Sequence, residues 1–579
     1  MATQHGFGSR YGINQAPGWL ALAVLGAALA CAAFTGSAAQ AQAASAAGQS
    51  ASDNARNPPA SHAATHISPE QAKDLFALVD QLIQFSSQET GLPDKNSVKR
   101  QLITRDQVEK YLQQKFDEDR SAQRLQQDEI LLKKFGLLDR DFALRPFLLA
   151  LLKEQIEAFY DEKTRTVNLL DWVDVDEQKP VMAHELTHAL QDQRINLAKW
   201  GDQTPDEVSK DASGDADHLV RDEWDTAREA VTEGQATAVM MDYILKPLGK
   251  SLVKNPEVIE AVQDQMTGSG DTPVMARAPL LLSESMLFPY RDGLSFEQDV
   301  WMDQGQAAAF AQMLDHPPTS SWEIMNPREF EQRHAPPVPL LPNIHPLVDK
   351  LYKPYDIGQM GQLDLHILAK LLGGDDAAGR LTSAWNGGLY WAGQLRSART
   401  GAERASTASV ALFYLSAWRN QASAAAFARL YGENLGRKYR DVKAEEPIES
   451  GNETTQVFAT SEGPVLITTR GKLVFISESF PAGLAHSLTE LLLDAQGSGE
   501  MRMARAASPA AREHTLTAGL VHLFGQCGVL KAVVRAGMQA SRAGSPSAEA
   551  SLLIRGDEAL IKPGMTLAVP AAADTQLHP

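Results

Sequence analysis

The sequence predicts an α+β protein that is mainly helical, with a small sheet beside one central helix. Long segments in which apolar residues recur at helical spacing make up much of the chain after residue 67. Segment 164–170 is rich in β-branched residues and alternates in part, as a short strand does. Two further apolar runs within 463–477 are separated by Arg-Gly-Lys and predict a hairpin.

Length and composition indicate a folded, acidic protein. The chain has 579 residues, of which 44% are hydrophobic, which suits one large domain or about two to three ordinary ones. The net charge is −18 and the pI is near 5.3, so nucleic-acid binding is not expected, because phosphate contacts need a basic surface. Cys31 and Cys527 are the only cysteines, which excludes a disulfide framework.

The N-terminal segment predicts export. Arg10 precedes an apolar run at 18–30, and Ala-Gln-Ala at 39–41 matches a signal-peptidase site. We therefore expect a signal peptide at 1–41 and a periplasmic or secreted bacterial protein. An uncleaved anchor and a lipoprotein cleaved at Cys31 are the alternatives. No later run predicts a membrane span.

A low-complexity linker at 42–66 separates this segment from the folded body. The first helix is expected to begin after Ser68, where Pro69 and Gln71 complete an N-terminal signal, and to end at Gly91. Further helices are expected at 104–135, 145–160, 180–194, 222–248, 362–372, 408–431 and 482–495. Irregular structure is expected at 201–217, 272–354 and 441–453.

The motif His-Glu-Leu-Thr-His at 184–188 carries the most chemical information in the chain. His184 and His188 lie four residues apart, so both imidazoles share one helix face and can reach one zinc ion. Glu185 lies beside that face, where it can accept a proton from a metal-activated water. In a random chain of this composition the expected number of such motifs is only about 0.02.

A catalytic zinc site needs a third protein ligand and an open position. No histidine follows His188 by six residues, which excludes the pattern H-E-x-x-H-x-x-G-x-x-H. Glu229 and Glu233 lie four residues apart on the next helix, and either could complete the site. Glu233 is favoured, because Gly234 would let the backbone closely approach the helix that carries His184 and His188.

Other residues are candidates for supporting roles. Asp192 follows His188 by four residues and could accept a hydrogen bond from it, or it could be an exposed charge near the helix end. The candidates for an oxyanion donor are His218, His316, His334, His345, Tyr243, Tyr355 and Tyr390.

Segment 184–193, His-Glu-Leu-Thr-His-Ala-Leu-Gln-Asp-Gln, and Glu-Gly-Gln-Ala at 233–236 resemble a bacterial family of zincin-like metallopeptidases of the gluzincin type. The resemblance includes Phe-Tyr-Asp at 159–161 and the segment 317–327, and it covers roughly residues 68–400. It implies a zincin-like catalytic core with a small sheet beside the motif helix.

The resemblance implies His184, His188 and Glu233 as Zn²⁺ ligands and Glu185 as the general base. The expected division is a metallopeptidase domain at 67–440, a hairpin-plus-helix extension at 441–495 and a C-terminal region of unknown role at 496–579.

We therefore expect an exported zinc metallopeptidase that acts on peptides or proteins. Segment 164–170 is expected to be the edge strand of the small sheet beside the zinc helix, where an extended substrate could pair with it. One alternative is an inert zincin-fold protein that binds or builds the cell envelope, and another is a zinc hydrolase of a non-peptide amide. Ala384 and Leu389 stand where the family has glycine and aspartate, so the resemblance supports the fold and the metal more than the substrate.

Overall fold

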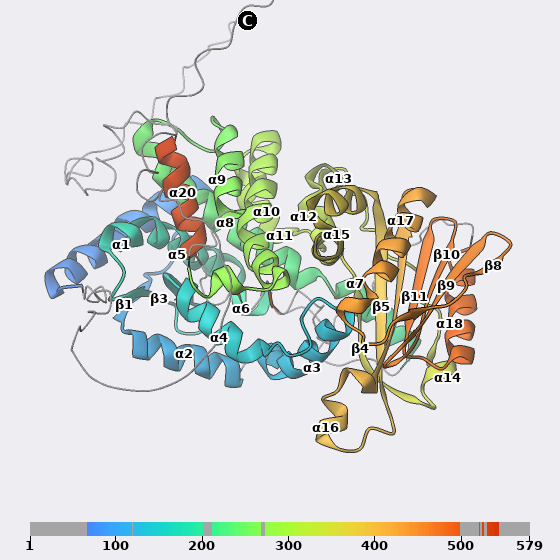
Figure 1. Cartoon of the computed structure of the whole chain (residues 1–579). Helices are drawn as coiled ribbons and strands as arrows, with labels where there is room; N and C mark the ends of the chain where they lie inside the picture. The colour runs from blue at the N-terminus through green and yellow to red at the C-terminus, as the bar shows by residue number, and fades with distance from the viewer. Residues whose placement is uncertain are drawn as a thin grey trace, which may run out of the picture. The chain divides into compact units, whose positions relative to one another are not determined.

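The protein is a mixed α and β structure that is mainly helical, as the computed structural model shows (Figure 1). The structure describes residues 67–118, 120–200, 211–267, 272–497, 520–521, 524–525 and 530–543. The expected signal peptide at 1–41, the linker at 42–66 and most of 496–579 lie outside these residues. Within them, no helix combines the length and apolarity that crossing a bilayer would require.

The described chain contains the following helices and strands in sequence order. The α-helices are α1 (Pro69–Thr90), α2 (Arg105–Glu118), α3 (Arg120–Phe135), α4 (Leu144–Gln155), α5 (Val175–Ile195), α6 (Leu197–Trp200), α7 (Ala212–Arg221), α8 (Trp224–Leu245), α9 (Glu257–Thr267), α10 (Leu280–Gln304), α11 (Met313–Asp315), α12 (Ser321–Met325), α13 (Pro327–Glu331), α14 (His345–Val348), α15 (Gln362–Ala384), α16 (Gly401–Arg404), α17 (Gln421–Glu433), α18 (Ala482–Ala495) and α20 (Lys531–Ala543). The strands are β1 (Lys99–Ile103), β2 (Ala158–Asp161), β3 (Thr166–Leu170), β4 (Tyr352–Gln359), β5 (Trp385–Leu395), β6 (Val410–Trp418), β7 (Lys443–Ala444), β8 (Ile448–Ser450), β9 (Glu453–Thr460), β10 (Gly463–Arg470) and β11 (Leu473–Glu478).

Helix α1 begins and ends as its sequence predicts. The Ser68 side chain accepts a hydrogen bond from the backbone N–H of Gln71, and the Gln71 side-chain oxygen accepts one from the backbone N–H of Ser68. Gly91 closes the helix with a left-handed backbone, φ 69°. The helix packs on α5, where the Ser86 hydroxyl donates to the Ala183 carbonyl at 3.1 Å.

The small sheet has the order β1-β3-β2, so the prediction that 164–170 is an edge strand is wrong. Strand β3 is the centre: β1 pairs with it in parallel and β2 in antiparallel register. The sequence does not predict either of the two strands that pair with β3. The run Lys-Arg-Gln-Leu-Ile of β1 is polar and partly exposed, and β2 lies within the predicted helix 145–160, which ends at Gln155. The free edge beside α5 is therefore β2.

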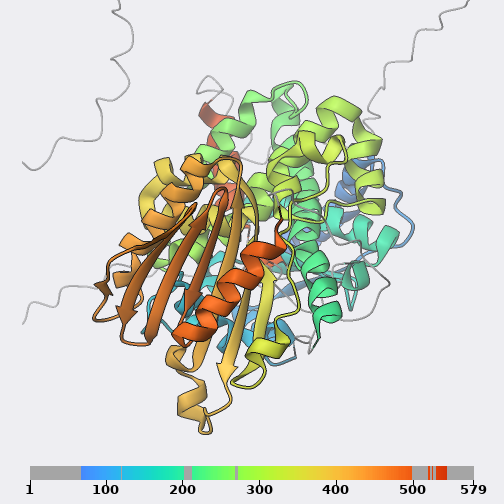
Figure 2. The same cartoon turned by 90° about the vertical axis from the view of Figure 1, so that its right-hand side faces the viewer.

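A larger antiparallel sheet has the order β4-β5-β6-β11-β10-β9-β7, with β8 paired to β9. In the sequence, β4 to β6 precede residue 440 and β7 to β11 follow it. Alternating side chains face opposite ways, as the pleat requires. Val474 and Ile476 pack into the core shared with α17, whereas Leu473 and Phe475 pack into the core shared with α18. Figure 2 shows α18 lying across one face of this sheet. The predicted hairpin within 463–477 is confirmed.

Other predictions also differ from the structure. The irregular segment expected at 441–453 contains β7 and β8, and the helix expected at 104–135 is divided into α2 and α3. The expected helix at 408–431 is strand β6 followed by α17, because a fully buried strand reads as a continuous apolar run that periodicity cannot tell from a helix. The irregular region expected at 272–354 contains α10, whose internal Pro289 and Gly293 made it read as broken. The loop expected at 201–217 contains the start of α7, with residues 201–210 outside the described part.

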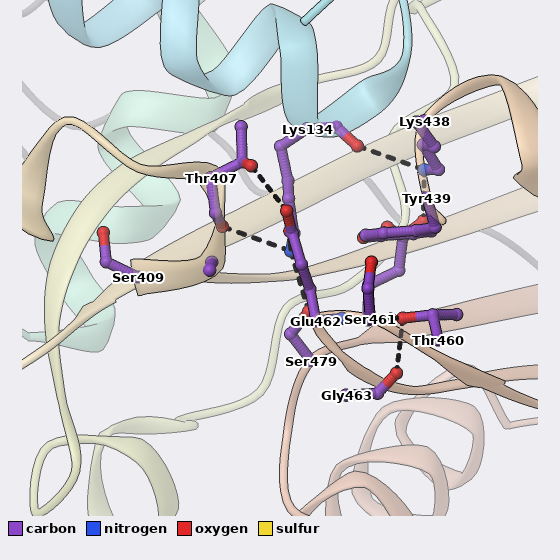
Figure 3. Close-up of polar contacts among 12 residues, drawn as sticks. Lys134, Thr407, Ser409, Lys438, Tyr439, Thr460, Ser461, Glu462, Gly463 and Ser479 are labelled. Carbon is purple, nitrogen blue, oxygen red and sulfur yellow. Dashed lines mark hydrogen bonds and ion pairs between the residues drawn. The ribbon is translucent and has the colours of Figure 1, made fainter. Parts of the chain in front are cut away.

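A buried polar cluster fastens α3 to the larger sheet (Figure 3). Lys134 of α3 has a side chain with no exposed surface, and its Nζ lies 2.9 Å from Glu462 Oε2 and 2.7 Å from Ser479 Oγ. A third, longer contact at 3.3 Å joins this ammonium to the Thr407 carbonyl. These acceptors come from three different connections of the sheet, so one lysine holds all of them to one helix.

Lys438 extends the cluster on its other side. Its Nζ donates to Glu478 at 2.6 Å, to the Tyr431 hydroxyl at 2.7 Å and to the Lys134 carbonyl at 3.1 Å. Burial lowers the pKa of both lysines, and Glu462 and Glu478 oppose that effect. We call these two lysines and two glutamates the lysine joint. Because each ammonium is hydrogen-bonded on several sides, its role is structural.

Candidate metal centre

Helix α5 carries the His-Glu-x-x-His motif and starts earlier than predicted. Asp174 caps it by accepting from the backbone of Asp176 at 2.8 Å, so the helix begins at Val175 and takes Pro180 into its second turn. The helix ends at Asn196, which has a left-handed backbone, φ 59°. The motif therefore lies in the middle of a long helix that is buried between α1 and α8.

Three donor atoms converge between α5 and α8. His184 Nε2 lies 3.0 Å from Glu233 Oε2, His188 Nε2 lies 3.4 Å from the same oxygen, and the two Nε2 atoms are 3.0 Å apart. Among the described residues these three are the group of histidine, cysteine and acidic side chains that could hold one metal ion. The His184 and Glu233 side chains are 1% and 3% exposed, whereas that of His188 is 12% exposed, so access is from its side.

The donor set fits a zinc-like ion. Two protein ligands at about 2.0–2.2 Å from a tetrahedral ion lie about 3.3–3.6 Å apart. The three separations of 3.0–3.4 Å are close to that edge length. Two imidazoles and one carboxylate also leave one tetrahedral position free, as hydrolytic sites require.

The charges of the group are complementary. Burial alone raises the pKa of Glu233, but His188 and His184 outweigh it and hold that pKa at about 2. Burial alone lowers the pKa of His188, but Glu233 outweighs it and raises that pKa to about 9. Burial and the neighbouring His188 lower the pKa of His184 to about 4. The group is therefore held together by an ion pair that a metal cation can replace.

Glu185 is placed as a base rather than as a ligand. Its Oε2 accepts a 2.6 Å hydrogen bond from the backbone N–H of Tyr160 in β2. Its Oε1 is buried and has no hydrogen-bond partner among the described residues. Burial raises the pKa of this carboxyl to about 7, with smaller effects from His188 and Glu233. A general base works best with a pKa near the working pH.

The alternative third ligand, Glu229, lies elsewhere on α8. A Cβ built on Gly525 would fall 1.4 Å from Glu229 Oε1, so this carboxylate packs against the C-terminal segment. Gly234 does allow a close approach, but to α10 and not to α5 as predicted. A Cβ there would lie 2.4 Å from the Gly293 carbonyl oxygen, and one on Gly293 would lie 2.2 Å from that of Ala230.

Asp192 does not orient His188. It accepts from the Tyr160 hydroxyl at 3.0 Å and from the Leu197 backbone at 3.0 Å. The partner of His188 Nδ1 is Gln191, at 2.9 Å. The sequence argument missed it because a carboxylate is the more familiar acceptor for a ligand histidine, while the i, i+3 spacing of Gln191 was available as a signal.

The candidates for an oxyanion donor contact other groups. His218, His334 and His345 each pair with a carboxylate, namely Asp222, Glu329 and Asp215. The hydroxyls of Tyr355 and Tyr390 donate to the Gln127 carbonyl and to Asp356, and the Tyr243 ring packs on Phe85. For His316 the structure gives no contact with the metal group. Tyr290 of α10 was not predicted, yet its ring centroid lies 6.2 Å from that of His184.

Comparison of the chain with protein-family models, with curated proteins and with solved structures found no match. The family resemblance of segments 184–193 and 233–236 therefore stays a prediction from those motifs.

Proposed function

We propose that the protein is a zinc-dependent hydrolase of peptide bonds, exported to the periplasm or beyond. His184, His188 and Glu233 are the proposed ligands, and Glu185 is the proposed general base. The observation that carries the proposal is the convergence of the two Nε2 atoms and Glu233 Oε2 within 3.4 Å of one another. Export rests on the N-terminal segment of the sequence.

Zinc is proposed because the donor set suits it. Neutral imidazole nitrogen and carboxylate oxygen are ligands that zinc takes in hydrolytic sites, and no sulfur ligand stands in this group. When bound, a zinc ion supplies a Lewis acid that polarises the carbonyl and acidifies the attacking water. The remaining steps belong to side chains of this chain.

Glu185 moves the proton. The Tyr160 N–H occupies its Oε2, so Oε1 is the oxygen that accepts the proton of the attacking water. The protonated carboxyl then delivers this proton to the leaving amine. The buried position of Glu185 keeps the acid form accessible near neutral pH.

Peptides are the proposed substrate class because of β2. This strand is the edge strand of the small sheet that lies beside α5, and its backbone N–H at Tyr160 is hydrogen-bonded to the base. An extended substrate that follows this edge would therefore carry its scissile bond past Glu185. This transfers to β2 the pairing role that the sequence suggested for 164–170.

The test is a digest of a diverse peptide library by the zinc-loaded protein, read by mass spectrometry. Glu185→Gln should keep zinc and lose hydrolysis by about 10²–10⁴-fold, because an amide cannot accept the proton. The matched control is Glu297→Gln, since Glu297 is equally buried but lies on α10, where burial alone raises its pKa. Cleavage by Glu185→Gln at the rate of the control would refute the assignment.

A further inference from the structure

Gln191 connects a proposed metal ligand to the neighbouring helix. Its Oε1 lies 2.9 Å from His188 Nδ1. Its Nε2 donates to the Thr232 carbonyl at 3.1 Å and to Gln235 Oε1 at 2.9 Å. Gln191 has no exposed surface, so its side-chain amide is hydrogen-bonded in the interior of the protein.

Gln235 continues the connection to a third element. Its Nε2 donates to the carbonyls of Ala309 at 2.8 Å and Phe310 at 3.1 Å. Both lie in the π-helical turn η3 (Ala308–Gln312). Gln235 is also fully buried. We call Gln191 and Gln235 the amide relay.

The hydrogen bonds of the amide relay can run in only one direction. Carbonyl oxygens cannot donate, so Gln235 must turn its Nε2 to the η3 carbonyls and its Oε1 to Gln191. The Thr232 carbonyl and Gln235 Oε1 in turn require the Nε2 of Gln191. Gln191 Oε1 is left to face His188 Nδ1, and an acceptor there requires a proton on Nδ1.

We propose that Gln191 is a positioning residue that holds His188 as its Nδ1–H tautomer, with Gln235 and the η3 carbonyls fixing the direction of its amide. The lone pair of a neutral imidazole is then on Nε2, the atom that faces His184 and Glu233. The inference rests on the proposed metal centre. Gln191 contacts one proposed ligand, His188, and Gln235 acts on that ligand through Gln191.

The relay differs from the usual arrangement in its charge. Ligand histidines are often held by a carboxylate, which makes the imidazole more basic. Here the acceptor is a neutral amide, and the carboxylate next to it in sequence, Asp192, is engaged by Tyr160 instead. Orientation of His188 is thereby achieved without adding a further buried carboxylate to Glu185 and Glu233.

The experiment measures zinc affinity of the full chain by competition with a chelator, with zinc alone as the probe. Gln191→Leu removes the acceptor and should weaken zinc binding about 10–100-fold. Gln191→Glu keeps an acceptor at His188 but loses the donor to the Thr232 carbonyl and Gln235 Oε1, so it should cost stability while keeping more zinc affinity than Gln191→Leu. Gln298→Leu is the matched control, because Gln298 is a buried glutamine that donates to a carbonyl, that of Leu252, away from the metal group.

The outcomes separate the two proposals. Equal zinc affinity in Gln191→Leu and Gln298→Leu, or equal losses in Gln191→Leu and Gln191→Glu, would overturn the positioning role while leaving the metal centre intact. Absence of zinc binding in the wild type would overturn both. If Gln191→Leu does not fold, Gln235→Leu is the substitute. It leaves Gln191 in place but removes one of the two acceptors that fix the direction of its amide. Unchanged zinc affinity in that variant would overturn the relay.

Discussion

The backbone N–H of Tyr160 donates a 2.6 Å hydrogen bond to Oε2 of Glu185. The edge strand of the small sheet therefore holds the proposed base through its main chain, which no substitution at position 160 other than proline removes. The Tyr160 side chain acts elsewhere, donating its hydroxyl to Asp192. The backbone of Tyr160 thus positions Glu185, whereas its side chain binds Asp192.

Tyr160→Phe should separate these two contributions. The variant loses the 3.0 Å bond to Asp192, and we expect the free energy of unfolding to fall by about 1–2 kcal/mol, since the acceptor is charged. Hydrolysis should be unchanged, because the bond to Glu185 remains. Denaturant unfolding and peptide hydrolysis check the two halves. A loss of turnover as deep as that of Glu185→Gln would place the hydroxyl in the chemistry and contradict this division.

Gly234→Ala should disturb the proposed metal centre through packing. The added methyl would lie 2.4 Å from the Gly293 carbonyl oxygen, so α8 and α10 must separate, at a cost of about 1–3 kcal/mol or more. Because Glu233 is the preceding residue, zinc affinity should fall as well.

The control for this substitution is Gly379→Ala in α15. A Cβ at Gly379 meets nothing within 4 Å, so alanine should stabilise the helix by up to about 1 kcal/mol. Thermal unfolding and zinc titration of both variants check the pair. Equal stability of the two would show that the glycine contact of α8 and α10 is unimportant.

The lysine joint should make stability depend on acid pH. Burial alone raises the pKa of Glu462, but Lys134 and its hydrogen bonds outweigh this and hold it below the ordinary value of 4.5. A carboxyl with a lowered folded pKa contributes stability above its unfolded pKa, and this contribution is lost as the pH falls through the folded pKa.

Glu462→Gln removes that contribution. At neutral pH it should lower the free energy of unfolding by about 3 kcal/mol, because Lys134 stays buried without its anion. Below about pH 4.5 the difference from the wild type should shrink. Unfolding curves of both proteins from neutral to acid pH provide the check. A difference that stays constant across this range would show that the pair contributes nothing through its charge.

Local signals predicted the parts of the fold that local chemistry decides. The cap at Ser68, the stop at Gly91 and the helix at 482–495 follow from capping and spacing alone. Strand β6 could not be predicted, because burial on both faces removes the alternation that marks a strand. Helix α10 carries Pro289 and Gly293 inside it, and only its packing on α8 explains the glycine.

The part of the candidate site that lies on a single helix, α5, was predictable from the sequence. Spacing within 184–188 placed both histidines on one face, but the choice between Glu229 and Glu233 needed the crossing of α5 and α8. Gln191 and Gln235 gave no sequence signal as a pair, since they lie on different helices and their direct hydrogen bond forms only where α5 packs against α8. Such contacts depend on tertiary packing that no local pattern encodes.

The most direct test is the zinc content of the purified protein after reconstitution, measured by elemental mass spectrometry for the wild type, Glu233→Ala and Glu229→Ala. We predict one zinc per chain in the wild type and in Glu229→Ala, because Glu229 packs against Gly525 and lies outside the donor group. Glu233→Ala should lose the metal. A wild type that takes up no zinc, or a Glu233→Ala variant that retains it, would contradict the proposed centre of His184, His188 and Glu233.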